Sequence, residues 1–182
     1  MKQIIALMVL TVWALSLNAG EPRYVGSEKC GRMCHKGEKK GKQWELWQSR
    51  KHARAYKTLG TPEAKEVAEK NGIKGSPQKA DECLRCHVTA FGVKKELVDP
   101  TCTYVEGVGC EECHGPGSEY KKIKIMKDQK LAFAAGLVEQ KEAVCIKCHN
   151  KESPTYKKPF IYKEAADSIA HLSPKTKASR NK

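Results

Sequence analysis

The strongest constraint in this sequence of 182 residues is a pattern of cysteine and histidine that occurs four times. Three segments read Cys-x-x-Cys-His, and a fourth has the same form with one extra residue between its cysteines. In chain order the motifs run from Cys30 to His35, Cys83 to His87, Cys110 to His114 and Cys145 to His149. Of nine cysteines, only Cys102 lies outside the pattern, so the fold must accommodate whatever these motifs bind.

Cys-x-x-Cys-His is the attachment signature of c-type haem. Two thiols three positions apart lie on one side of a helical turn, where they can form thioethers to two vinyl groups at one porphyrin edge. The histidine that follows then lies beneath the iron as its proximal ligand. We predict four haem c groups with an atypical first attachment site, because that site has three intervening residues. The predicted attachment cysteines are Cys30, Cys34, Cys83, Cys86, Cys110, Cys113, Cys145 and Cys148, and the predicted proximal ligands are His35, His87, His114 and His149.

Two other uses of paired cysteines are weaker interpretations. Eight thiols could build two four-cysteine zinc sites, and Cys-x-x-Cys pairs also serve in disulfide exchange. Neither chemistry explains a histidine directly after the second cysteine in all four pairs. Haem attachment explains every one.

The N-terminus predicts export. Residues 4–17 are mostly apolar, and this run is shorter than the roughly 20 residues that a spanning helix needs. Lys2 precedes it and small residues follow it, so residues 1–19 are expected to be a signal peptide, with an uncleaved anchor as the alternative. We expect a periplasmic or extracellular protein without a transmembrane anchor.

Composition indicates that haem must supply the interior. Hydrophobic residues make up 40% of the chain and aromatic residues only 7%, which is a thin basis for a protein core. We expect a mainly α fold with little or no sheet, in which short helices and loops wrap around four closely packed covalent haems. This domain spans residues 20–174, and residues 175–182 form a flexible basic tail. Without haem the chain should be largely unfolded.

Periodicity and end signals place the expected elements. Residues 91–109 read as a loop or small hairpin, and residues 153–160 read as a proline-containing connector. Helical segments are expected over residues 44–56, 61–70, 80–87, 138–149 and 162–170.

Counting histidines limits the iron ligands. The chain has six histidines, of which four lie in the motifs, so His52 and His171 are the candidate distal ligands. At least two irons therefore lack a second imidazole; they are five-coordinate or use water, an amine or a methionine, for which Met126 is the candidate. If the helix runs on from near Gly41, His52 reaches a neighbouring haem more readily than that of its own motif. Cys102 is expected to be a buried free thiol, with an intermolecular disulfide or a minor ligand role as alternatives.

The charge favours protein partners. Lys and Arg exceed Asp and Glu by 34 to 21, a net charge of +13. Haem propionates would offset much of this excess, and export argues against nucleic acid, so we expect no nucleic-acid partner. Some lysines could guide docking to acidic redox partners, an effect that salt would screen.

Three segments resemble a tetrahaem cytochrome c family whose best-known member accepts electrons from hydroxylamine oxidoreductase. Gly107 to Gly117 resembles its third haem motif, Cys83 to Gly92 is similar to its second, and Trp47, Ser49, His52, Ala53 and Ala55 match its first long helix. Related chains occur among multihaem cytochromes of metal-respiring bacteria. The resemblance implies a distal role for His52 and a five-coordinate, high-spin second haem. The family's distal histidine soon after Gly-Pro-Gly is missing here, since no histidine lies between His114 and His149.

These observations predict an electron carrier rather than an enzyme, passing electrons between redox partners through a chain of four haems. The alternative is a haem enzyme that reduces a small nitrogen oxide at a five-coordinate iron. A homo-oligomer or a subunit of a polymeric haem wire is a further possibility.

Overall fold

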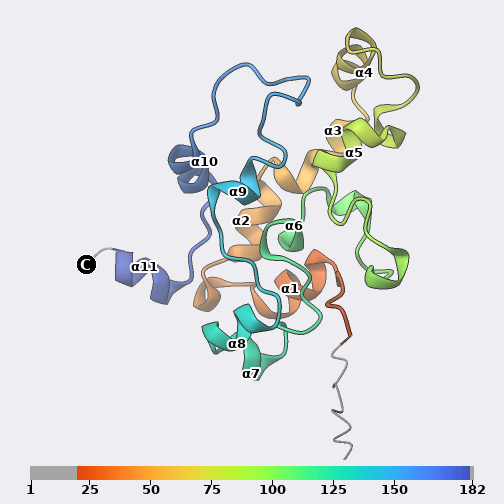
Figure 1. The fold of residues 1–182 in the computed structure, drawn as a ribbon. Helices are drawn as coiled ribbons and strands as arrows, with labels where there is room; N and C mark the ends of the chain where they lie inside the picture. The colour runs from red at the N-terminus through yellow and green to blue at the C-terminus, as the bar shows by residue number, and fades with distance from the viewer. Residues whose placement is uncertain (1–19, 181–182) are drawn as a thin grey trace, which may run out of the picture.

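A computed structural model describes residues 20–180 of the chain, so the expected signal peptide, residues 1–19, and the last two residues lie outside the description. The described part is an assembly of short helices joined by loops (Figure 1). Within it no β-sheet forms, and the only strand pairing is an isolated parallel bridge between Tyr24 and Val98. The expectation of a mainly α fold is thus confirmed. None of the described helices is both long enough and apolar enough to cross a membrane.

The α-helices are brief; the longest, α4, has nine residues. In chain order they are α1 (Ser27–Cys34), α2 (Gln43–Ser49), α3 (Ala55–Thr58), α4 (Pro62–Lys70), α5 (Asp81–His87), α6 (Cys110–His114), α7 (Ile123–Met126), α8 (Gln129–Ala134), α9 (Glu142–Cys145), α10 (Tyr162–Ile169) and α11 (Pro174–Arg180). Five 3-10 turns lie between them: η1 (Glu38–Lys40), η2 (His52–Arg54), η3 (Pro77–Lys79), η4 (Lys95–Leu97) and η5 (Tyr104–Glu106).

The helix expected over residues 44–56 is broken. Helix α2 ends at Ser49, and Arg50 adopts an extended conformation with φ −89° and ψ 163°. The chain restarts in η2, which begins at His52, and continues into α3. His52 therefore lies at a bend between two short helices. The expectation that one continuous helix from near Gly41 carries it towards a neighbouring haem is wrong.

Two other segments differ from their sequence-based interpretation. Helix α9 stops at Cys145, so Cys148 and His149 lie in the turns that follow and not in a helix over residues 138–149. Helix α11 spans Pro174–Arg180 and so takes in most of residues 175–182, the segment expected to be a flexible basic tail. The side chain of Ser173 accepts a hydrogen bond from the Thr176 N–H at 3.2 Å and so caps the first turn of that helix.

Helices α4, α5 and α10 lie close to their expected positions. Helix α4 begins as its sequence indicates, because the Thr61 hydroxyl accepts the Ala64 N–H at 3.2 Å and proline follows the cap. Residues 91–109 contain two 3-10 turns and no hairpin.

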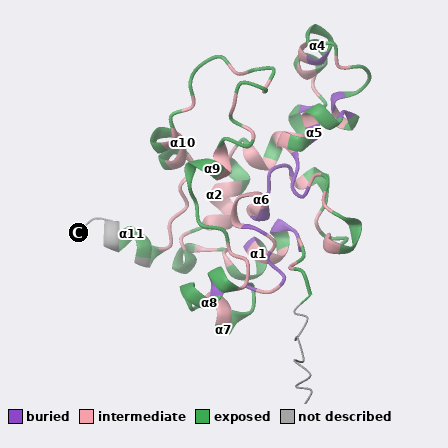
Figure 2. Ribbon diagram, viewed as in Figure 1, coloured by how far each residue is buried: buried purple, intermediate pink, exposed green. Residues whose placement is uncertain are grey.

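Little of the described chain is buried (Figure 2). Leu59, Leu84 and Val88 form a small hydrophobic cluster, against which Tyr56 and Phe91 pack. The largest side chain buried to less than 2% exposure is a carboxylate, Glu111. Several large apolar side chains stay exposed: Met33, Tyr104, Val105, Ile123, Leu131, Phe133, Val138, Ile146 and Ile161. The polypeptide alone thus builds only a minor core, which fits an interior completed by a bound group.

Candidate haem-binding site

The first motif places both of its cysteines on α1. Cys30 and Cys34 are four positions apart, which separates their directions around the helix by about 40°, whereas residues three apart differ by about 60°. The extra residue in this motif therefore keeps both thiols on one face of the helix. Cys30 is half-buried and Cys34 is exposed. The local structure is compatible with two thioethers here, despite the unusual spacing.

The other motifs use helix ends differently. Helix α5 ends on the second motif, and α6 consists entirely of the third, so each carries its cysteine pair at a helical spacing. In the fourth motif only Cys145 belongs to α9, and the backbone N–H of His149 donates to the Cys145 carbonyl at 3.0 Å. All nine cysteines are free thiols.

Helix α6 lies near the centre of the described structure and contacts α1 (Figure 1). Its first N–H, on Cys110, donates to the Ser27 hydroxyl of α1 at 3.0 Å. The N–H of Gly109 donates to the Thr89 hydroxyl at 2.7 Å, just after the second motif. The third motif is thereby tied to the first and second by side chains that satisfy backbone groups near the start of α6.

The Gly-Val-Gly segment before α6 passes close to the backbone at His52 and needs glycine there. Gly107 has φ +71°, and a Cβ atom there would lie 2.6 Å from the His52 carbonyl oxygen. The next residue, Val108, donates its N–H to that same oxygen at 2.9 Å, while its own carbonyl accepts the Trp47 indole N–H at 3.0 Å. This segment therefore fixes the backbone at His52.

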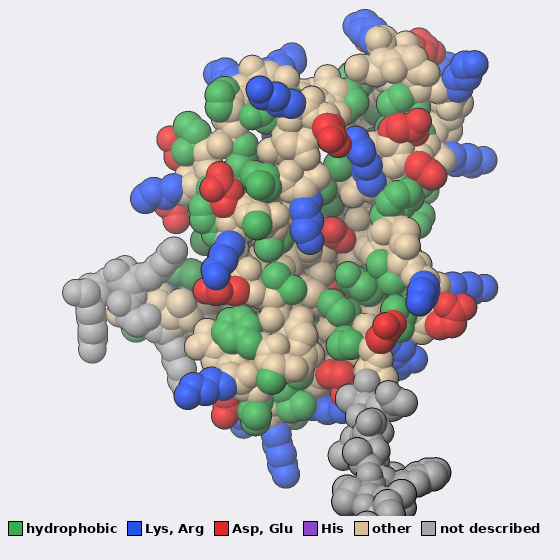
Figure 3. Space-filling model, viewed as in Figure 1, with side chains coloured by type: hydrophobic (Ala, Val, Ile, Leu, Met, Phe, Trp, Pro, Cys, Tyr) green, Lys and Arg blue, Asp and Glu red, His purple; other side chains and the backbone are tan. Residues whose placement is uncertain are grey.

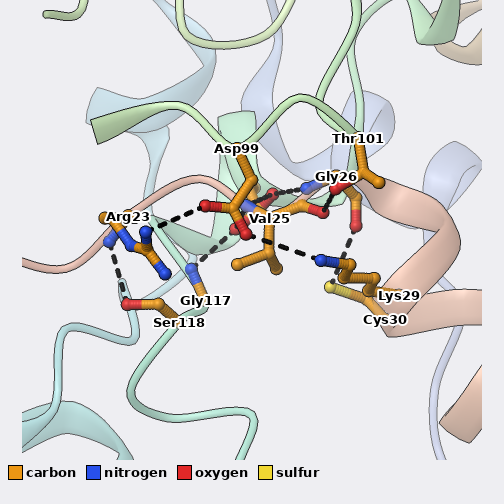
Figure 4. Close-up of polar contacts among 10 residues, drawn as sticks. Arg23, Val25, Gly26, Lys29, Cys30, Asp99, Thr101, Gly117 and Ser118 are labelled. Carbon is orange, nitrogen blue, oxygen red and sulfur yellow. Dashed lines mark hydrogen bonds and ion pairs between the residues drawn. The ribbon is translucent and has the colours of Figure 1, made fainter. Parts of the chain in front are cut away.

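Glu111, between the two cysteines of the third motif, anchors the N-terminal segment. Its carboxylate accepts the N–H groups of Val25 at 2.9 Å, of Gly26 at 2.7 Å and of Gly117 at 2.7 Å. Figure 4 shows these donors converging from the chain before α1 and from the Gly-Pro-Gly loop. Burial raises the pKa of Glu111, while the backbone donors act in the opposite direction.

Two ion pairs that share the Asp99 carboxylate lie beside this anchor. The Arg23 guanidinium lies 3.3 Å from the Asp99 carboxylate, and the Lys29 ammonium lies 3.5 Å from it (Figure 4). The Thr101 hydroxyl donates to the Val25 carbonyl at 2.9 Å. The sequence motifs alone gave no sign of this network, because its partners come from segments more than 60 residues apart.

Both histidines outside the motifs lie against motif histidines. The His52 ring centre is 6.1 Å from that of His149, with the rings at 87°. The His171 ring centre is 5.9 Å from that of His114, at 79°. Two imidazoles that bind one metal ion from opposite sides have centres roughly 6 Å apart, since each metal–nitrogen bond is about 2 Å and each ring centre lies about 1 Å beyond. The spacing of both pairs fits an iron between them.

Polar contacts at Nδ1 orient four of the six histidine rings and leave Nε2 available as a ligand atom. His114 Nδ1 lies 3.4 Å from the Gln140 side-chain nitrogen. His35 Nδ1 is 2.6 Å from the Gln43 side-chain oxygen, and His87 Nδ1 is 2.9 Å from the Ala55 carbonyl oxygen. His171 Nδ1 is 3.0 Å from the carbonyl oxygen of Ile169.

The electrostatic surroundings keep key imidazoles neutral, the form that binds metals. Burial, followed by the neighbouring His171 and His35, lowers the pKa of His114 to about 4. Burial and then His149 lower the pKa of His52.

Thiols of different motifs are neighbours in a definite order. Burial and then Cys110 raise the pKa of the Cys30 thiol. In the same way burial and then Cys145 raise the pKa of Cys113 to about 11. Each thiol pair joins two motifs, the first to the third and the third to the fourth.

The remaining junction joins the second motif to the fourth. Burial and then Cys86 raise the pKa of Cys148 to about 12. The Cys148 thiol also lies 4.0 Å from the Arg85 carbonyl oxygen of the second motif. The second motif thus adjoins the fourth as well as the third, and the third motif adjoins all of the others.

Two further observations fit a bound porphyrin. The Nε of Arg50 is buried without a hydrogen-bond acceptor among the described residues, and a haem propionate would supply one. A cavity of about 540 Å³ opens beside Cys148 and His149, and the Phe160 ring stacks on His149 with centres 4.9 Å apart. By contrast, no three His, Cys, Asp or Glu side chains of residues 20–180 are grouped so as to hold a metal ion by themselves.

Cys102 and Met126, which sequence reasoning singled out, are both half-buried. Cys102, expected as a buried free thiol, is free and half-buried, and burial and then Glu111 raise its pKa to about 12. Met126 ends α7 and is half-buried. Sequence reasoning missed Arg50, Gln43 and Glu111, which carry no motif signal of their own.

Comparison with known proteins agrees with this geometry. Residues 29–115 match the family model described as "Cytochrome c554 and c-prime", a region that contains the first three motifs. The chain is 32% identical over 122 residues to cytochrome c-554 of Nitrosomonas europaea, covering 65% of this chain and 49% of that protein. It is 30% identical over 107 residues to the multiheme cytochrome MtrA of Shewanella baltica, covering 50% of this chain and 31% of that protein.

The fold extends the likeness along more of the chain. The reduced state of cytochrome c554 from Nitrosomonas europaea superimposes with a TM-score of 0.53 and 26% sequence identity, covering 84% of this chain and 80% of that one. In the sequence comparisons, by contrast, the chain spans about half the length of the cytochrome c-554 sequence and about a third of MtrA.

Proposed function

From the match of residues 29–115 to the cytochrome c554 family, we propose that the chain carries electrons between redox proteins outside the cytoplasm through four covalently bound haems. Haem iron supplies the one-electron couple between ferrous and ferric states. The chain supplies eight attachment thiols in four motifs and the histidines that face the iron positions.

The observation that carries this proposal is the continuous adjacency of the four motifs. The Cys110 N–H of the third motif bonds to Ser27 of α1, the Gln140 amide just before α9 donates to the Cys113 carbonyl, and the Cys148 thiol lies 4.0 Å from the Arg85 carbonyl oxygen of the second motif. Porphyrin edges attached at neighbouring thiols lie close together, so the motifs can form one uninterrupted series. Such a series suits transfer between two partners better than four isolated sites would.

The surface charge bears on docking. On the face drawn in Figure 3, Lys and Arg side chains are spread over the surface, with Asp, Glu and hydrophobic side chains between them. Since the whole sequence carries a net charge of +13 before haem is added, an acidic partner is the favoured class.

Haem loading can be tested directly. Intact mass of the mature protein should exceed the mass of the polypeptide by four haems, and the reduced protein should show sharp visible bands. Cys34→Ala should leave the first haem attached through one thioether, whereas Cys30→Ala with Cys34→Ala should remove one haem. A product with three haems in the unaltered protein would contradict haem attachment at the first motif.

Electron transfer is tested by stopped-flow oxidation of the reduced holoprotein. An acidic redox protein should oxidise it with a rate constant that falls as ionic strength rises from about 0.01 to 0.5 M, because salt screens the steering charges. A basic redox protein of matched potential is the control, and its rate should not fall. Equal salt dependence for both would contradict an acidic partner.

One observation favours a second candidate function. His87 has no second imidazole facing it among the described residues, so the second-motif iron could bind and reduce a small nitrogen oxide. Sustained turnover of nitric oxide by the purified holoprotein would favour this enzyme, whereas binding without turnover would favour the carrier.

A further inference from the structure

The histidine pairs also determine which irons lack a second imidazole. The chain has six histidines, and the pairs His52 with His149 and His171 with His114 use four of them. His35 and His87 remain, and the Nδ1 atom of each lies within hydrogen-bonding distance of an oxygen atom. Sequence counting gives the number of such irons, while the ring contacts say where they are.

The two unpaired histidines belong to the first and second motifs. The imidazole pairs occupy the third and fourth motifs. The third motif is bonded to the first through Cys110 and Ser27, and to the second through Gly109 and Thr89. The third motif, whose histidine is paired, therefore contacts both motifs whose histidines are unpaired.

The first motif is also positioned to meet solvent. Met33 is 77% exposed and Cys34 is exposed, so the last turn of α1 lies at the surface. Met33 stands between the two attachment cysteines, on the same turn that presents His35, and so it cannot reach the opposite face of the iron. The sixth position above His35 is left to an external ligand.

We propose that the first-motif iron, held by His35, is a second binding site for a neutral diatomic ligand, in addition to the second-motif iron. This inference rests on the proposed haem loading. It gives the protein two ligand-accessible irons, at the first and second motifs, beside two irons with paired histidines at the third and fourth motifs. Nitric oxide and carbon monoxide are the class of ligand that ferrous iron with one free position binds.

The hydrogen bond from His35 to Gln43 provides a specific readout. Resonance Raman spectra of five-coordinate ferrous haem show an iron–histidine stretching mode, whose frequency falls when the hydrogen bond at Nδ1 is lost. The unaltered protein should show two such modes, one from the first-motif iron and one from the second-motif iron. Gln43→Leu should lower the frequency of one mode and leave the other unchanged, because the Nδ1 of His87 is bonded to a backbone carbonyl.

Ligand stoichiometry is the second measurement. Carbon monoxide titration of the reduced holoprotein should give two binding equivalents per four haems, and electron paramagnetic resonance of the ferric form should give two bis-histidine irons. His52→Ala and His171→Ala should each raise the carbon monoxide stoichiometry to three and lower the bis-histidine count to one.

Met126 supplies the matched control. Met126→Leu should leave two equivalents and both stretching modes in place. One equivalent in the unaltered protein that becomes two in Met126→Leu would show Met126 to be the sixth ligand of one of these irons, and it would overturn the inference if the stretching mode that Gln43→Leu lowers is present only in Met126→Leu. A single iron–histidine mode that Gln43→Leu does not move would overturn it as well. A haem count below four by mass would instead refute the proposed loading, so the two failures are distinguishable.

Discussion

Glu111 offers the sharpest test of how the haem motifs are held together. Glu111→Gln keeps the shape of the side chain and replaces one carboxylate oxygen by an NH₂ group. One oxygen accepts from Val25 and Gly117, and the other accepts from Val25 and Gly26. Whichever oxygen is replaced, the new NH₂ group faces backbone N–H donors at 2.7–2.9 Å, and those donors lose their acceptor.

The magnitude follows from the number of donors affected. A buried donor left without an acceptor costs about 1–3 kcal/mol. With one or two donors affected, we expect the free energy of unfolding of the holoprotein to fall by roughly 2–4 kcal/mol. For a chain of this size that corresponds to a decrease in Tm of about 4–16 °C.

Thermal unfolding of the holoprotein followed by circular dichroism measures the effect. Glu112→Gln is the matched control, because Glu112 is the next residue and accepts one longer backbone bond, from Ala90 at 3.2 Å. We expect a decrease of at most about 1 kcal/mol for the control. If both variants unfold within about 1 °C of the unaltered protein, the view that Glu111 anchors the segment before α1 to the third motif is wrong.

Other substitutions test separate parts of the structure. Gly107→Ala should lower the free energy of unfolding, measured by chemical denaturation, by about 2 kcal/mol or more. Gly72→Ala, at a similar φ of +70° but in open space, should lower it by only about 1 kcal/mol. Equal losses for the two variants would contradict the close contact at Gly107. Arg50→Leu should lower the midpoint potential of one haem in a spectroelectrochemical titration, because a buried cation favours the reduced iron. Arg54→Leu, at an exposed position, should leave all four potentials unchanged. Equal shifts for the two variants would refute a contact between Arg50 and a haem. Leu84→Ala should cost about 2–4 kcal/mol in urea unfolding, because it opens a cavity in the hydrophobic cluster, and an unchanged midpoint would show that cluster to be dispensable.

The haem motifs could be found from sequence because thioether attachment and proximal ligation are local chemistry. A cysteine pair and the next histidine lie within six residues, so their spacing alone specifies the bound group. The same locality made the short helices α4 and α5 predictable, since caps and helix formers act within one or two turns. The scarcity of apolar residues also indicated, without coordinates, that polypeptide could not fill the interior.

Only the tertiary structure decided which parts meet. The break at Arg50, which turns the chain into His52, has no clear signal in the helical periodicity, because it depends on the contact with Gly107 and Val108 far along the chain. The pairing of His52 with His149, and of the C-terminal His171 with the third motif, likewise joins segments many residues apart. Spacing along a sequence fixes what a short segment can bind, whereas the choice of distal partner depends on long-range packing that no local pattern records.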